Sequence, residues 1–417
     1  MEATVWNERM LAALEAGVKG GKWFSLIDKV YALPNLRAAF ARVKANAGAE
    51  GVDRQTIEMF EAHLEANLQK LADELRASQY HPRPVRRAWI EKLGKRHEKR
   101  PLGIPTIRDR VVQTALRNVL EPIYEKDFAP QSYGFRPGRG CKDALRRVVE
   151  LFAAGYTWVV DADLKSYFDT IPHQPLLERV REKVSDGRVL ELVSAYLKQP
   201  VMESHKQWTP QGGTPQGAVL SPLLSNIYLH PLDHLMAQEG YEMVRYADDF
   251  VILCRSEAEA QRALERVQQW TARAGLTLQP EKTRIVEASA GEGFAFLGYH
   301  FQHGRKWPRQ KSAQKLKHTL RAKTKRTSGL SLSLIIENVN RTTRGWFEYF
   351  QHSHPRTFPR LDGWVRMRLR SILRKRRGLK GRGRGRDHQR WPNAFFAKHG
   401  LFSFTTAHAI TCQSSRR

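Results

Sequence analysis

Residues 243–254 read MVRYADDFVILC, in which two short apolar runs lie on either side of a Tyr-Ala-Asp-Asp turn. This pattern predicts a β-hairpin. The turn holds two adjacent carboxylates, Asp248 and Asp249, which repel each other when both are ionised. Divalent cations remove that cost, and hard oxygen ligands suit Mg²⁺, which Mn²⁺ can replace. A polar turn without chemistry is the alternative for an Asp-Asp dipeptide taken alone.

A third acid is expected from residues 159–169, VVDADLKSYFD, where a β-branched run leads into acids. Asp161 and Asp163 face the same side of such a strand, so spacing alone does not choose between them. Two metal ions held by carboxylates activate a hydroxyl and stabilise leaving pyrophosphate in phosphoryl transfer. The sequence therefore predicts a two-metal nucleotidyl-transfer site.

The Tyr-Ala-Asp-Asp segment resembles the catalytic block of reverse transcriptases, and other segments follow in that family's order. The resemblance implies that Asp163, Asp248 and Asp249 are the catalytic metal ligands, with the backbone of Leu164 beside them. It also places Phe168 as an aromatic gate against the 2′-hydroxyl of ribonucleotides.

Two later blocks extend the resemblance. Residues 213–222, GTPQGAVLSP, resemble the block that packs against the incoming nucleotide and the template, which implies that Gln216 lies in the nucleotide pocket. Residues 278–283, LQPEKT, resemble the next block, whose lysine, here Lys282, lies near the triphosphate.

Upstream, residues 100–110, RPLGIPTIRDR, and 131–139, QSYGFRPGR, are similar to finger blocks of bacterial group II intron reverse transcriptases. Those enzymes place basic residues on the nucleotide phosphates at the positions of Lys92 and Arg100. The run 92–100, KLGKRHEKR, lacks the family's usual Pro after the first lysine, so a solvated charge run is the alternative. The triphosphate contact stays open among Lys92, Lys95, Lys99 and Arg100.

Residues 340–350, NRTTRGWFEYF, resemble the maturase or thumb domain of the same enzymes. Helical spacing predicts an apolar core stripe of Leu334, Ile335, Val339, Trp346, Phe347 and Phe350. A basic helix is expected over 365–377. Arginines of the 340–350 segment, of the basic helix and of the finger block 131–139 are predicted to contact nucleic-acid phosphates. They are Arg136, Arg139, Arg341, Arg344, Arg366, Arg370, Arg374, Arg376 and Arg377.

Charge is distributed unevenly along the 417 residues. The net charge is +28, yet residues 301–417 hold 29 Lys and Arg against 4 acids, whereas the first 300 hold 41 against 38. This asymmetry predicts a polyanionic partner. RNA is favoured over a membrane surface, and no apolar run approaches the roughly 20 residues that span a bilayer. Three scattered cysteines exclude a disulfide scaffold, and the N-terminal residues show no secretion signal, so a bacterial cytoplasmic protein, nucleoid-associated when acting on DNA, is expected.

The expected fold is α+β: a right-hand polymerase of fingers and palm, an α-helical thumb or maturase domain, and a basic C-terminal tail. The expected bounds are 1–33 for a helical N-terminal segment, 34–304 for fingers and palm, 305–377 for the thumb and 378–417 for the tail. Asp387, His388, Asn393 and His399 superficially echo a His-Asn-His endonuclease, but no Cys pair accompanies them, so no such domain is expected.

The expected function is RNA-directed DNA polymerisation for a group II intron, together with binding of the intron RNA to assist splicing and mobility. The implied partners are intron RNA, an RNA template with a DNA primer, target DNA and deoxynucleoside triphosphates; the sequence does not indicate an oligomeric state. The alternatives are a catalytically silent RNA-binding maturase, or a retron, diversity-generating or defence-type reverse transcriptase.

Overall fold

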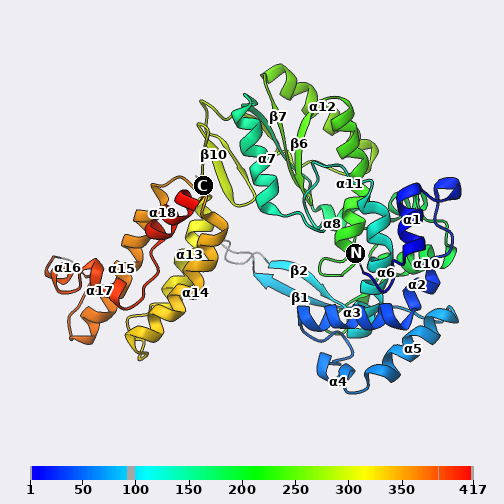
Figure 1. Ribbon diagram of the computed structural model, residues 1–417, viewed down its shortest axis with the longest axis horizontal. Coiled ribbons are helices and arrows are strands. Elements are labelled where there is room, and N and C mark those ends of the chain that lie inside the picture. Colours follow the sequence, from blue (N-terminus) through cyan, green and yellow to red (C-terminus); the bar gives the residue numbers. More distant parts are fainter. Residues whose placement is uncertain (1, 92–98, 384, 415–417) are drawn as a thin grey trace. The chain divides into compact units, whose positions relative to one another are not determined.

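The computed structural model describes residues 2–91, 99–383 and 385–414 (Figure 1). The chain forms two compact units, residues 1–285 and 286–417. Sheets and helices are mixed in both units, which confirms the predicted α+β class. Among the described residues, no helix has the length and apolar character needed to cross a bilayer.

The predicted hairpin lies in a four-stranded sheet of order β6-β7-β3-β8. The interior strands β3 and β7 are antiparallel neighbours and carry mostly buried side chains. Helix α12 packs against both of them, and α7 and α11 pack against β6. The elements are β3 Trp158–Asp163, β6 Glu242–Tyr246, β7 Asp249–Cys254, β8 Arg284–Glu287, α7 Cys141–Ala153, α11 Ser221–Gln238 and α12 Glu257–Arg273.

A second sheet in the first unit has the order β2-β1-β4-β5. Its strands are β1 Val85–Glu91, β2 Lys99–Ile104, β4 Val201–Glu203 and β5 Lys206–Trp208. Residues 101–104 belong to β2 although the segment begins with a proline. Pro101 is accommodated because β2 is an edge strand, where a missing N–H costs no ladder bond.

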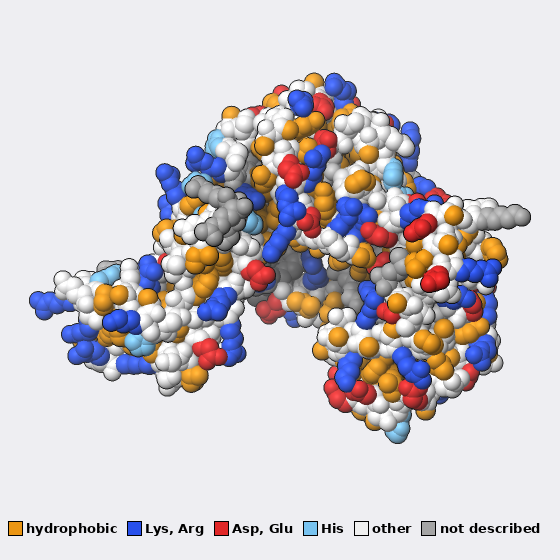
Figure 2. Space-filling view, viewed as in Figure 1, with side chains coloured by type: hydrophobic (Ala, Val, Ile, Leu, Met, Phe, Trp, Pro, Cys, Tyr) orange, Lys and Arg blue, Asp and Glu red, His pale blue; other side chains and the backbone are white. Residues whose placement is uncertain are grey.

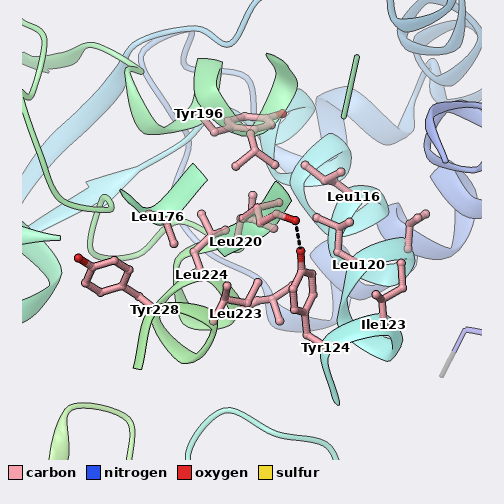
Figure 3. Packing of buried hydrophobic residues seen from close by; sticks show 14 of the residues in the cluster. Leu116, Leu120, Ile123, Tyr124, Leu176, Tyr196, Leu220, Leu223, Leu224 and Tyr228 are labelled. Atoms are coloured by element: carbon pink, nitrogen blue, oxygen red, sulfur yellow. Dashed lines mark hydrogen bonds between the residues drawn. The ribbon is translucent and has the colours of Figure 1, made fainter. Parts of the chain in front are cut away.

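Helices complete the core of the first unit. In Figure 3, Leu116 and Leu120 of α6 lie across from Leu223 and Leu224 of α11, and the hydroxyl of Tyr124 donates to the Val180 carbonyl at 2.8 Å. Apolar residues keep helical spacing over 57–78, but His63 has a non-helical conformation and divides this segment into two helices. The helices are α1 Glu8–Ala16, η1 Lys19–Gly21, α2 Ile27–Tyr31, α3 Leu33–Asn46, α4 Ile57–Glu61, α5 Leu64–Arg76, α6 Ile107–Glu125, α8 Tyr167–Thr170, α9 His173–Arg181 and α10 Gly187–Leu197.

The second unit pairs a three-stranded sheet with helices. Its elements are β9 Phe294–Phe296, β10 Tyr299–Gln302, β11 Arg305–Pro308, α13 Gln310–Lys323, α14 Leu332–Phe350, α15 Thr357–Arg376, α16 Arg386–Arg390, α17 Asn393–Lys398 and α18 Phe404–Ser414. The small sheet is joined to α14, because Tyr299 donates to the Tyr349 carbonyl and Tyr349 to the Leu297 carbonyl, both at 2.7 Å. The compact unit therefore begins before residue 304, where the sequence places the end of the palm.

Candidate active site

The sheet register brings two of the predicted acids together. Asp163, at the end of β3, pairs directly with Asp249, at the start of β7. Side chains directly opposite in an antiparallel pair have Cβ atoms about 4.5–5.5 Å apart. Asp248 precedes Asp249 in the hairpin turn, so all three predicted catalytic acids lie at one end of the sheet.

The register also separates the two acids that spacing leaves equivalent. Asp161 lies opposite Val251, and its carboxylate is 3.6 Å from Nε of Arg284. Asp163, not Asp161, is therefore the strand acid that faces the Asp-Asp turn.

A buried arginine holds the turn from behind. Arg245 is fully buried, and its guanidinium forms a two-pronged ion pair with the buried carboxylate of Asp233, with an Nε to Oδ1 distance of 2.7 Å. The same group donates to the Ala247 carbonyl at 2.8 Å, to Asn226 Oδ1 at 3.0 Å and to Ser132 Oγ at 2.8 Å. Ala247 has a left-handed φ of 59°, a conformation that costs about 1 kcal/mol or more outside glycine. The arginine thus stabilises the strained residue that directs both acids.

The QSYGFR segment lies against the same turn. Tyr133 N donates to the Arg245 carbonyl at 2.8 Å, and Asn226 donates to the Gly134 carbonyl at 2.8 Å. A Cβ placed on Gly134 would lie 2.2 Å from the backbone nitrogen of Ala247, so only glycine fits there. The next residue, Phe135, is half-exposed, and its ring centroid lies 6.5 Å from that of Phe168 and 6.3 Å from that of Tyr246.

The electrostatics of Asp248 reflect its crowded position. Burial raises the pKa of Asp248, and the neighbouring Asp163 carboxylate raises it further. The positive charges of Arg100 and Arg245 act in the opposite direction and lower that pKa. Negative charge is therefore costly at the turn, although two arginines reduce the cost.

Lys282 neutralises the third acid. Its ammonium group forms an ion pair with Asp163 Oδ2. The segment is held there because Gln279 N donates to the Asp163 carbonyl at 2.7 Å and Leu278 bridges to Leu164. A cation bound to Asp163 would release Lys282 toward an anionic group nearby.

The donor set suits Mg²⁺ completed by a substrate. Within the described part of the chain, no three acidic, His or Cys side chains are gathered closely enough to form a ready-made metal cage. Mg²⁺ is usually held by one or two carboxylates together with water and substrate phosphates rather than by such a cage. The facing carboxylates of Asp163 and Asp249, together with Asp248, whose pKa burial raises, are oxygen donors of the kind that the predicted metals need.

The predicted nucleotide residues border these acids. Phe168 lies on α8, and its carbonyl accepts from Thr214 N at 2.6 Å, which ties the GTPQG loop to α8. Gln216 lies in that loop, and its amide donates to Asp169 Oδ2 at 3.2 Å. Arg100, on β2, is exposed and is close enough to lower the pKa of Asp248. Lys92 and Lys95 lie outside the described residues.

Two of the arginines predicted to contact nucleic acid are buried inside the protein. Arg136 is 7% exposed, and it pairs with Glu125 and donates to the carbonyls of Ala129 and Ser132. Arg370 is 3% exposed and donates to the Trp391 carbonyl and to Asn393 Oδ1, both at 2.9 Å. Contrary to the prediction, these two guanidinium groups stabilise the fold and are not offered to a polyanion.

The other predicted arginines lie nearer the surface, and Figure 2 shows Lys and Arg side chains spread over the visible face of the second unit. Arg366 is half-buried, and Arg374 is paired with the buried Asp387 at 2.6 Å. Arg341 also has an acidic partner, Glu337. The predicted arginines whose side chains are exposed are Arg139, Arg341, Arg344, Arg376 and Arg377.

Sequence reasoning missed Arg245, Asp233 and Phe135. Arg245 had a visible signal, since a lone arginine inside the apolar run MVRY must find a buried partner. Its partner lies on α11, twelve residues earlier, and no local pattern identifies it. Phe135 had a weaker signal, because the sequence pattern alone does not show that its ring is half-exposed beside Phe168.

Comparison with known proteins agrees with this geometry. Residues 90–301 match the family described as reverse transcriptase (RNA-dependent DNA polymerase), and residues 313–391 match the group II intron maturase-specific domain. Protein YkfC of Escherichia coli (strain K12) is 34% identical over 308 residues, covering 64% of this chain and 80% of YkfC.

Two further similarities are partial. The group II intron-encoded protein LtrA of Lactococcus lactis subsp. cremoris is 39% identical over 202 residues, which cover 48% of this chain and 33% of LtrA, so the chain matches about a third of that relative's length. A solved chain of a partial Cas6-RT-Cas1–Cas2 complex is 26% identical, with a TM-score of 0.38, over 60% of this chain and 41% of that one.

Proposed function

Because the chain belongs to the reverse transcriptase family and carries a group II intron maturase domain, we propose that it is an RNA-directed DNA polymerase of a group II intron. One observation carries the proposal: Asp163 lies directly opposite Asp249, beside a half-buried Asp248 whose pKa is raised. Keeping these neighbouring carboxylates ionised costs free energy, and bound cations would offset that cost. A catalytically silent maturase has no evident need for this arrangement of acids.

The metal ligands are proposed to be Asp163, Asp248 and Asp249, with the backbone of Leu164. When bound, two Mg²⁺ ions supply the Lewis acidity that activates a primer 3′-hydroxyl and stabilises the leaving pyrophosphate. Lys282 and Arg100 bring positive charge to the same end of the sheet, where they would bind the triphosphate.

The remaining pocket residues orient the nucleotide. Phe168 is proposed to exclude the 2′-hydroxyl, and Gln216 to contact the nucleotide from the loop that is tied to Phe168. Lys92 keeps its proposed role at the phosphates from sequence resemblance alone.

The second unit is proposed to bind intron RNA and so assist splicing and mobility. Residues 286–417 carry 29 Lys and Arg against 6 acids, and the maturase match covers 313–391. Dense positive charge on a folded surface favours a large polyanion. An RNA template, a DNA primer, target DNA and deoxynucleoside triphosphates complete the proposed set of partners.

Primer extension on an RNA template with Mg²⁺ tests the polymerase. We expect Asp248→Ala and Asp163→Asn to reduce extension to background, because each removes a proposed metal ligand. Asp161→Asn is the matched control, since this acid lies on the same face of β3 but opposite Val251. Extension by Asp248→Ala at the wild-type rate would contradict the proposal, and retained splicing assistance with no extension by wild type would indicate a silent maturase.

A further inference from the structure

One face of the β2-β1-β4-β5 sheet carries exposed aromatic side chains. Alternation along β1 places Arg87 and Trp89 on the same side. The register Val85↔Val201, together with Val201↔Trp208, places Trp208 of β5 on that side as well. Trp89 is 49% exposed and Trp208 is 40% exposed.

Arg87 links the two indoles. Its guanidinium carbon lies 5.9 Å from the ring centroid of Trp89 and 5.5 Å from that of Trp208. Among the described residues, no hydrogen-bond partner lies within reach of its buried Nε. Trp89 Nε1–H donates to Glu203 Oε1 at 2.5 Å, which fixes the orientation of one indole. The face is therefore a pre-ordered aromatic surface with a cation between its rings.

This aromatic surface shares a cavity with the nucleotide residues. Trp89, Arg87 and Trp208 line the same hollow as Phe168, Asp169 and Gln216. The acids that border it already have partners, because Asp169 accepts from Gln216 at 3.2 Å and Glu203 accepts from Trp89. Arg87 places a positive charge between the two indoles, so the stacking surface itself is cationic although two carboxylates border the hollow.

We propose that Trp89 and Trp208 bind unpaired template nucleotides by stacking against their bases, next to the nucleotide pocket. Exposed indoles provide the flat faces that single-stranded nucleic acid uses, and the stacking tolerates any base sequence. Arg87 adds cation–π stabilisation and attraction for the backbone. This inference rests on the proposed polymerase function, because it assigns the template as the strand that reaches the cavity.

Equilibrium binding to two RNA–DNA duplexes tests the inference. Both duplexes have the same paired region, and their 5′ template overhangs consist of a single nucleotide or of several. We expect the wild type to bind the longer overhang about fivefold more tightly or better, since base–aromatic stacking contributes about 1 kcal/mol or more per base. The Trp89→Ala/Trp208→Ala variant should lose that difference, whereas Phe24→Ala, which removes a 72% exposed aromatic outside the cavity, should keep it.

Abasic nucleotides in the overhang give a second measurement without changing the protein. The wild type should then lose most of its preference for the longer overhang and keep only the part that the extra phosphates contribute. A preference of undiminished size in the double variant or with abasic sites would overturn the inference, as would an equal loss of affinity for both duplexes. Extension of the single-nucleotide overhang by wild type tests the polymerase separately: its failure would contradict the proposed function, whereas normal extension without any overhang preference would contradict only the stacking.

Discussion

At the scale of single residues, the buried Arg245–Asp233 pair is the clearest determinant of the site. Both side chains are fully inaccessible, and the arginine also holds the carbonyl of Ala247. We expect Arg245→Gln to lower the free energy of unfolding by about 3–5 kcal/mol, because Asp233 would keep a buried charge without a counter-ion. Denaturant unfolding measures this loss.

The exposed pair Arg266–Glu239 is the matched control. Arg266→Gln should change the free energy of unfolding by less than about 1 kcal/mol, since water and salt screen a surface ion pair. Equal losses in the two variants would contradict the structural role of Arg245.

The raised pKa of Asp248 predicts that its carboxylate lowers the stability of the metal-free protein at neutral pH. Its pKa in the folded protein is raised by burial, so the folded state loses stability as pH rises from the ordinary carboxyl range through the raised pKa. We expect metal-free Asp248→Asn to melt at a higher temperature than wild type at neutral pH. The gain should vanish at a pH low enough to protonate the carboxyl in both folded and unfolded states.

Thermal melting across pH, with and without Mg²⁺, checks this expectation. Mg²⁺ should stabilise the wild type more than Asp248→Asn, because ligand binding to the folded state raises its stability. A variant that melts below the wild type at neutral pH would show that the carboxylate is stabilising there.

At the scale of elements, the 131–136 segment and the β6–β7 hairpin act as one support. Gly134 lies against the turn backbone, and Arg136 anchors the segment through Glu125. We expect Gly134→Ala to displace the turn and to reduce the extension rate by about tenfold or more, since small misplacements at a reacting centre cost about 100-fold in some cases. Gly187→Ala is the control, because open space surrounds that glycine at the start of α10.

Circular dichroism should show that Gly134→Ala remains folded while single-turnover kinetics report the slower step. An unchanged extension rate would show that the segment does not position the acids.

The elements also show what sequence could predict. The β6–β7 hairpin and the acids of β3 are encoded locally, by apolar runs that end in carboxylates, and both were predicted. The core stripe of α14 was mostly predicted, since Ile335, Val339, Phe347 and Phe350 are buried. Leu334, however, is 48% exposed, and Ile336 is buried in its place. The partner helices decide which apolar residue of the first turn is covered, and helical spacing does not contain that information.

Long-range partners explain the other errors. Arg136 and Arg370 look like surface arginines in a basic sequence, yet carbonyl groups brought in by the fold occupy their donors. Residues 294–302 form the β9–β10 hairpin, in which Leu297 and Gly298 adopt left-handed conformations that turn the chain. Local composition predicts charge and apolarity correctly in these cases, but tertiary contacts decide the outcome.

At the scale of the whole molecule, charge divides along the two compact units. Residues 1–285 hold 41 Lys and Arg against 36 acids, and residues 286–417 hold 29 against 6. In the first unit, basic residues nearly balance the acids, and buried arginines such as Arg245 offset the acids locally. In the second, few acids interrupt the positive field, so the attraction for a polyanion is not cancelled locally.

This division predicts where salt dependence originates. We expect replacement of the exposed Arg376, Arg377 and Arg382 by Gln to reduce the slope of log Kd against log salt for intron RNA by about 0.7–0.9 per lost phosphate contact. Replacement of Arg76, Arg146 and Arg179 removes the same net charge from the first unit, where each has an acidic partner, and should leave the slope nearly unchanged. Equal changes in the two triple variants would mean that net charge, not the second unit's surface, governs RNA binding.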